Sequence, residues 1–120
     1  MPFNYLLTNL LVDVPTAVGA IFLDEEGETI ECVTRHADPY EMKVEGAYHS
    51  IFKRRFETAL RTAATRGLSR YTMTFDRLAT LTEILPGGYY VVLVMDREGS
   101  EALARRHLQK AARIIARELA

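Results

Sequence analysis

Hydrophobic residues recur along the chain with two periods, one typical of helices and one typical of strands. Between positions 3 and 13 the leucines follow a helical spacing with one broad apolar face, and Pro15 ends the segment. Ser100 is a suitable N-cap for a last helix. Its apolar stripe consists of Leu108, Ala111, Ala112, Ile115 and Leu119. The pattern therefore predicts a helix at each end of the sequence.

Five shorter runs have the length and composition of β-strands. They cover residues 17–23, 28–35, 69–75, 78–85 and 89–95. A turn at Glu26-Gly27 separates the first two runs, so they should form a hairpin. Short turns at 76–77 and 86–88 separate the last three, which should form an antiparallel meander.

Two of these runs are apolar on both alternating faces. In the run 17–23, Val18, Ala20 and Phe22 are predicted on one face. Ala17, Ile21 and Leu23 are predicted on the other. The run 89–95 has the same character, whereas Glu31 and Arg35 give the second run one polar face. Strands covered on both sides belong in the middle of a sheet, so we predict an α+β fold with a five-stranded antiparallel sheet in the order 2-1-5-4-3.

A long amphipathic helix is predicted between the second and third strands. Asp38 is its N-cap, Pro39 occupies the first helical position, and Glu41 completes a variant of the capping box. The helix runs to about Arg66 and ends at Gly67. We expect this helix on one face of the sheet and the two terminal helices on the other, all within a single domain at 1–120.

The predicted sheet and central helix leave apolar surface that one copy of the chain does not cover. Five strands make a face about 24 Å wide, while a helix is about 10 Å across. The apolar arc of the central helix spans roughly half its circumference, and the third strand is an edge without proline. These features favour a homodimer over the alternative, a wide core stripe with an edge protected by Arg70 and Arg77. Its interface is predicted to consist of Tyr48, Phe52, Phe56, Ala59, Leu60, Ala63, Arg70, Tyr71, Thr72, Met73 and Thr74.

Composition narrows the compartment and the partners. The 120 residues are 48% hydrophobic and carry a net charge of −1, which favours neither nucleic acid nor acidic membranes. Cys32 is the one cysteine, as expected in a reducing compartment. The N-terminal apolar run has no preceding Lys or Arg and is too short to cross a bilayer. We therefore predict a cytoplasmic protein without membrane insertion.

No set of residues assembles a recognisable active site. Asp24, Glu25 and Glu26 form a carboxylate cluster in a hairpin turn, where solvation explains them better than cation binding. A loop histidine, His36, precedes the helix cap Asp38, which explains that pair without acid–base chemistry. The other two histidines, His49 and His107, have no partner at metal-ligand spacing. Cys32 is expected inside the sheet as a small hydrophobe.

Basic residues are the remaining candidates for a binding role. They comprise the run Lys53-Arg54-Arg55 and the arginines Arg105, Arg106, Arg113 and Arg117. Acidic residues balance them and no exposed aromatic residues are interleaved, so solvated helix faces are favoured over a nucleic-acid site. We predict no enzyme activity, no metal and no cofactor.

Two local patterns give the chain a family resemblance. Residues 18–30, VGAIFLDEEGETI, resemble a strand–D-x-x-G–strand hairpin, and residues 85–94, LPGGYYVVLV, resemble a glycine turn that enters a central strand. With the order of elements, these patterns resemble the Roadblock family of dynein light chains and bacterial GTPase regulators. The resemblance implies the same sheet order, and a dimer joined through the central helix and third strand.

The resemblance also implies that the chain binds or regulates a Ras-like small GTPase. No catalytic residue carries over, because the family has no catalytic signature of its own. The candidate contact residues are polar positions of the central helix: Lys43, Lys53, Arg54, Glu57 and Arg61. Two other classes stay open, a small-ligand sensor domain and a structural subunit of a motor or scaffold complex.

Overall fold

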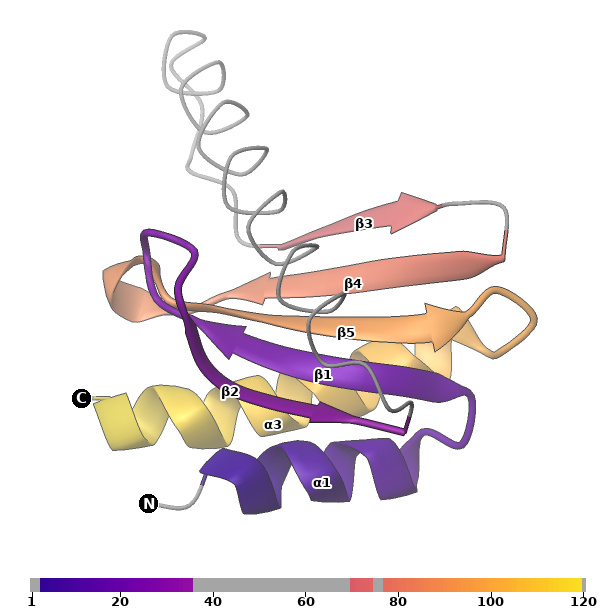
Figure 1. The fold of residues 1–120 in the computed structure, drawn as a ribbon, viewed down its shortest axis with the longest axis horizontal. Helices are drawn as coiled ribbons and strands as arrows, with labels where there is room; N and C mark the ends of the chain where they lie inside the picture. Colours follow the sequence, from indigo (N-terminus) through magenta and orange to yellow (C-terminus); the bar gives the residue numbers. More distant parts are fainter. Residues whose placement is uncertain (1–2, 36–69, 75–76, 120) are drawn as a thin grey trace, which may run out of the picture.

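The computed structural model describes residues 3–35, 70–74 and 77–119, and within them two helices pack against a five-stranded sheet (Figure 1). The helices are α1 (Phe3–Asp13) and α3 (Glu101–Leu119). The strands are β1 (Ala17–Leu23), β2 (Thr29–Thr34), β3 (Arg70–Thr74), β4 (Leu78–Ile84) and β5 (Tyr90–Asp96). A short 3₁₀ turn, Pro86–Gly88, joins β4 to β5.

The strand order is β2-β1-β5-β4-β3, and every neighbouring pair is antiparallel. In the central pair, Ile21 of β1 faces Val92 of β5. Both central strands are buried along most of their length, whereas β2 is partly exposed at every position. The predicted fold class and sheet order are therefore confirmed, and the reason is the one expected, that the two strands apolar on both faces take the middle.

The predicted faces of β1 are wrong at its first two residues. Pairing with β5 shifts register between Ala17 and Gly19. An extra residue of this kind reverses the alternation of side chains on its N-terminal side. As a result Ala17 packs in the same cluster as Phe22, and Val18 packs with Ile21 on the opposite face.

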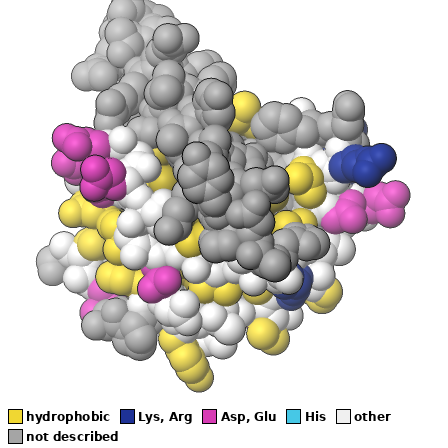
Figure 2. Space-filling model, in the orientation of Figure 1, with side chains coloured by type: hydrophobic (Ala, Val, Ile, Leu, Met, Phe, Trp, Pro, Cys, Tyr) yellow, Lys and Arg dark blue, Asp and Glu magenta, His cyan; other side chains and the backbone are white. Residues whose placement is uncertain are grey.

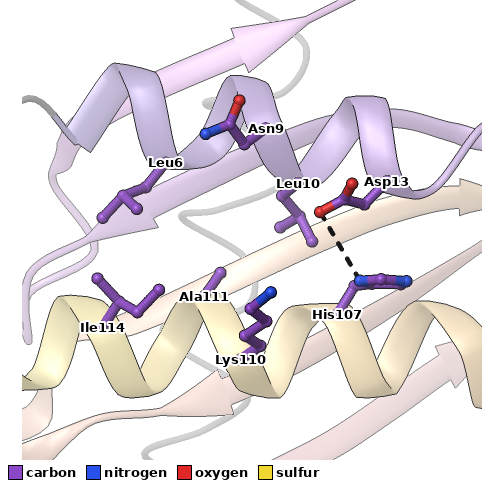
Figure 3. Close-up of a pocket in the computed structure, with 8 residues that line it drawn as sticks. All are labelled: Leu6, Asn9, Leu10, Asp13, His107, Lys110, Ala111 and Ile114. Atoms are coloured by element: carbon purple, nitrogen blue, oxygen red, sulfur yellow. Dashed lines mark ion pairs between the residues drawn. The ribbon is translucent and has the colours of Figure 1, made fainter.

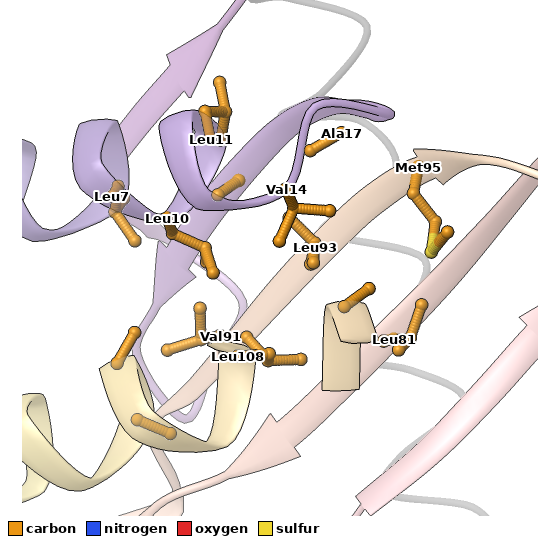
Figure 4. Packing of buried hydrophobic residues seen from close by; sticks show 14 of the residues in the cluster. Leu7, Leu10, Leu11, Val14, Ala17, Leu81, Val91, Leu93, Met95 and Leu108 are labelled. Atoms are coloured by element: carbon orange, nitrogen blue, oxygen red, sulfur yellow. The ribbon is translucent and has the colours of Figure 1, made fainter. Parts of the chain in front are cut away.

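The larger core cluster fills the space between the sheet and the two helices (Figure 4). Leu7, Leu10 and Leu11 point inward from α1, and Leu108 and Ile115 from α3. The sheet contributes residues of alternate positions, including Phe22, Leu81, Val91, Leu93 and Met95. The terminal helices thus share one face, as predicted, and their helical spacing of apolar residues is what directs them onto it.

The opposite face of the sheet carries a second buried cluster. It consists of Ile21, Leu23, Tyr90, Val92 and Val94, with the partly buried Cys32 beside it. Cys32 is thus a small apolar side chain within the sheet, as predicted. Both described helices lie on the other face, and the central helix predicted at about 38–66 lies outside the described residues.

The β1–β2 turn is built by one carboxylate. Asp24 accepts hydrogen bonds from the backbone N–H of Glu26 at 2.9 Å and of Glu28 at 3.0 Å. Gly27 has a φ of 86°, a left-handed conformation that glycine adopts without steric cost. Acidic side chains gather over the end of the molecule that holds this turn (Figure 2). The carboxylate of Asp24 therefore serves the turn itself.

Arg35, directly after β2, caps the C-terminal end of α1. Its guanidinium donates hydrogen bonds to the carbonyl oxygens of Leu11 and Ala17, to that of Val14 at 3.3 Å, and to that of Pro15 at 2.8 Å. The last turn of α1 contains no basic residue. Arg35 therefore supplies from a distant part of the chain both the donors and the positive charge that a helix C-terminus needs.

We expect Arg35→Ala to lower the free energy of unfolding by about 1–2 kcal/mol, because four carbonyl groups lose a charged donor. Urea denaturation followed by circular dichroism measures the change. Arg77→Ala, at another exposed arginine, is the matched control and should stay within about 0.5 kcal/mol of the wild type. Equal stability of the two variants would contradict the capping role.

Candidate interaction edge at strand β3

β3 forms one edge of the sheet and pairs only with β4 among the described strands. It has five residues, and its register places Arg70 opposite Glu83 and Thr74 opposite Ala79. Along its outer side, an edge strand of this kind is a template for pairing with a further strand, because it has only one pairing neighbour among the strands that the structure describes. This outer side, with the side chains of residues 70–74, is called the β3 edge below.

One face of the β3 edge is apolar and half-buried. Tyr71 lies opposite Thr82, with which its side chain forms a hydrogen bond, and Met73 lies opposite Thr80. Burial raises the pKa of the Tyr71 phenol above its ordinary value, and the nearby Tyr90 adds to the increase. The hydrogen bond to Thr82 lowers the pKa without offsetting the burial. Tyr71 therefore stays neutral well into the alkaline range.

The opposite face of the β3 edge is polar and is fastened to its neighbours. The guanidinium Nε of Arg70 lies 2.9 Å from the Oε2 of Glu83, whose residue is only 6% exposed. Arg105 of α3 donates a hydrogen bond to the hydroxyl of Thr72 and lies 3.6 Å from Glu101. The buried carboxylate of Glu83 needs a partner such as Arg70, because an unpaired buried charge is energetically costly. These contacts hold the short strand in place from one side.

A cleft of about 290 Å³ opens beside this polar face, between the end of β4 and α3. Arg70 and Glu83 line it together with Gln109 and Arg113. Because Arg70 and Glu83 already pair with each other, Arg113 is the remaining charged residue in the walls of the cleft. Sequence reasoning missed the role of Glu83, although an acidic residue inside a strand that is otherwise threonine and apolar was a usable signal.

The structure describes only part of the predicted interface. It places residues 70–74 in the strand at one edge of the described sheet, as their position in the third strand predicted. The other six predicted interface residues, Tyr48, Phe52, Phe56, Ala59, Leu60 and Ala63, lie outside the described residues. The five candidate GTPase contacts, Lys43, Lys53, Arg54, Glu57 and Arg61, also lie outside them.

The three histidines were the other candidates for chemistry, and the structure describes the surroundings of one of them. His107 of α3 lies 3.8 Å from the Oδ2 of Asp13 at the end of α1, a partner that its sequence position did not reveal. His36 and His49 are outside the described residues. Within residues 3–35, 70–74 and 77–119, no three His, Cys, Asp or Glu side chains cluster as metal ligands do. None of the helices in these ranges is long and apolar enough to span a bilayer.

A second hollow lies on the outer side of the molecule, between the two helices (Figure 3). This groove measures about 320 Å³ and is lined from α1 by Leu6, Asn9, Leu10 and Asp13. From α3 it is lined by His107, Lys110, Ala111 and Ile114. It was not predicted, because it depends on how two segments almost 100 positions apart lie against each other.

An antiparallel sheet with both described helices on one face is an architecture, and it does not by itself define a chemistry. Comparison with solved structures narrows the architecture further. The chain resembles Myxococcus xanthus MglB with a TM-score of 0.88 over 98% of its length and 94% of that chain, at 13% sequence identity. It resembles a Roadblock/LC7 domain from Streptomyces avermitilis with a TM-score of 0.86 at 16% identity, over 96% and 95% of the two chains.

A third structure, described as MglB with tetrameric arrangement, matches with a TM-score of 0.86 at 14% identity, over 96% of this chain and 85% of that one. No protein-family model and no curated protein matches the sequence. The chain therefore has the Roadblock/LC7 fold. The resemblance drawn from its hairpin and its glycine turn is confirmed at the level of the fold.

We expect the buried phenol of Tyr71 to make the protein less stable at alkaline pH. Its folded-state pKa is raised, so its contribution is complete below the unfolded value of 10.0 and is lost as pH rises beyond it. Tyr71→Phe should remove a phenol ionisation above pH 10, seen in the ultraviolet absorbance difference from wild type. It should also make stability fall less steeply in that range. Tyr5→Phe, at a residue 65% exposed, controls for the loss of one phenol. An ionisation of Tyr71 at or below pH 10 would contradict the burial of its side chain.

Proposed function

We propose that the chain is a Roadblock-type homodimer, joined through the β3 edge, that binds a Ras-like small GTPase. The observation that carries the proposal is the β3 edge itself, a strand with one pairing neighbour among the described strands that carries half-buried Tyr71 and Met73. The Roadblock/LC7 fold supports it. The tetrameric arrangement named for one MglB structure supports self-association as a property of this fold.

Pairing two β3 edges would extend one sheet into the next. Two identical strands that pair antiparallel are related by a two-fold axis perpendicular to the sheet, so each face of one copy continues the same face of the other. Tyr71 and Met73 of both copies would then gather on the face opposite α1 and α3. The sequence also predicts the central helix on that face, so strand and helix residues are proposed to form one continuous contact.

The dimer is tested by placing a charge at the centre of the contact. Met73→Lys sets two ammonium groups near each other in the paired strands, where like charges are destabilising. Light scattering on wild type should give about 27.2 kDa, twice the 13.6 kDa of one chain, and on the variant a mass close to 13.6 kDa.

Ile30→Lys is the matched control, because Ile30 is 43% exposed on β2, the other edge of the same sheet. This variant should remain dimeric. A monomeric wild type at micromolar concentration, or equal masses for the two variants, would contradict pairing through β3.

The GTPase is proposed as the partner on the strength of the fold. Binding can regulate a GTPase by favouring one of its conformations, which requires differential affinity and no catalytic group. This form of regulation therefore needs only a binding surface on the chain. Lys43, Lys53, Arg54, Glu57 and Arg61 remain the predicted contacts, and the dimer presents each of them twice.

Capture of partners from the native cell lysate, with a GTP analogue or GDP added, tests this proposal. The wild type should recover a small GTPase, with a yield at least several-fold higher for one nucleotide. Met73→Lys should recover much less, while Ile30→Lys should match the wild type. Recovery of partners that include no small GTPase, and that do not change between the GTP analogue and GDP, would overturn the proposal and favour a structural subunit.

A further inference from the structure

A line of four cations follows the outer surface of α3. Arg106, Lys110, Arg113 and Arg117 are spaced four, three and four residues apart, which places them on one side of a helix. All four are exposed, and no ion pair joins any of them to another residue in the described part of the chain. The line is about 16 Å long, from eleven residues at 1.5 Å each. It is called the α3 cation line below.

The acidic residues of α3 do not neutralise this line. Glu101 pairs with Arg105, and Glu118 lies about a third of a turn away from the four cations around the helix. The net charge of −1 therefore conceals a separation of charge. Acidic residues concentrate at the β1–β2 turn, at positions 24–26 and 28, while α3 carries five Lys and Arg residues against two Glu residues.

Apolar side chains are exposed on the neighbouring helix. Tyr5 and Val12 of α1 are 65% and 69% exposed, and they are seven residues apart, on the side of the helix opposite its buried leucines. α1 lies alongside α3 on the same face of the sheet (Figure 1). The outer side of α1 thus carries two exposed apolar side chains beside the polar Thr8 and Asn9, as in a helix that is amphipathic toward a surface.

The groove between the helices connects the two features. Its walls include Lys110, which belongs to the α3 cation line, and the apolar Leu6 and Ile114 (Figure 3). The one carboxylate in its walls is that of Asp13, whose Oδ2 lies 3.8 Å from the Nδ1 of His107. Lys110 extends from α3 toward α1 across the hollow. A negatively charged group could therefore enter the groove beside an ammonium group with apolar side chains around it.

We propose that the outer face of the α1–α3 layer docks on an anionic membrane surface. Cations attract acidic lipid head groups, and a tyrosine with an exposed apolar neighbour suits the boundary between head groups and acyl chains. The charge extends in a line over a layer of two helices, with apolar side chains beside it, which matches an extended surface better than a single acidic side chain. This is peripheral binding, and it involves a face that the proposed dimer leaves free.

Co-sedimentation with vesicles tests the proposal on the full chain. The wild type should bind vesicles containing roughly one-third phosphatidylserine and bind pure phosphatidylcholine vesicles at least tenfold more weakly. Binding should decrease as salt increases, because the attraction is screened. Because the cations lie on α3, Met73→Lys should still bind anionic vesicles. This arm separates membrane docking from the dimer and the GTPase proposals.

Substitutions locate the binding face. Each cation near an anionic surface contributes about fivefold to the partition coefficient, so Arg113→Gln should lose about fivefold and Lys110→Gln/Arg113→Gln roughly 30-fold. Arg77→Gln removes one exposed arginine away from α3 and should change binding less than twofold. Val12→Ser should weaken binding several-fold without changing its salt dependence. Circular dichroism melts confirm that the variants fold.

Three outcomes would overturn the proposal. They are equal binding to neutral and anionic vesicles, equal loss for Arg113→Gln and Arg77→Gln, and absence of vesicle binding. If vesicles are not bound while soluble polyglutamate binds in a manner that depends on Arg113, the occupant of this face is an acidic protein segment instead.

Discussion

Burial of β1 and β5 on both faces is the constraint on which the rest of the structure depends. A strand without a polar face cannot form an edge or lie against water on either side. Once these two strands pair, each has one open side, and the hairpin partners β2 and β4 occupy those sides. The remaining strand, β3, is then the last of the described strands on its side. Its place at an edge is thus a consequence of where the most hydrophobic strands must lie.

The two edges of the sheet are finished in different ways. Beyond the end of β2, Arg35 connects the edge to the carbonyl groups at the end of α1, so this side of the sheet is joined to the helix layer. At β3, the ion pair of Arg70 with Glu83 holds one face of the strand in place. The opposite face is apolar and half-buried, because it carries Tyr71. The two edge strands therefore differ in chemistry: the β2 side is joined to a helix end, and β3 has one polar and one apolar face.

Most of the described fold could be predicted from the sequence, because hydrophobic periodicity reports local geometry. The runs of β1 and β5, the stripe of α3 and the turn at Gly27 were all recognisable from neighbouring residues. What could not be predicted depends on contacts between distant segments. The register shift after Ala17, the capping by Arg35 and the pairing of Glu83 with Arg70 are of this kind.

The same distinction holds for the candidate sites. Residues 70–74 could be placed on an edge because strand order follows from the apolar pattern of other strands. The groove and the cation line were harder to interpret. Arg106, Arg113 and Arg117 were visible as charges, but only the structure shows that α3, which carries them, lies alongside α1, which carries the exposed Tyr5 and Val12. A charge count over the whole chain averages away such an arrangement.

The pairing of β1 with β5 also joins residues that lie far apart in the sequence. Ala20 faces Leu93 across the β1–β5 pair, 93 − 20 = 73 residues further along the chain. By contrast, α1, β1 and β2 fall within the first 35 residues, and β3, β4 and β5 within 70–96. Two local units can form early, but closing the long loop between them carries the larger entropic cost. Joining these two units is therefore the step that should set the folding rate, and until it occurs both of the most hydrophobic strands remain exposed.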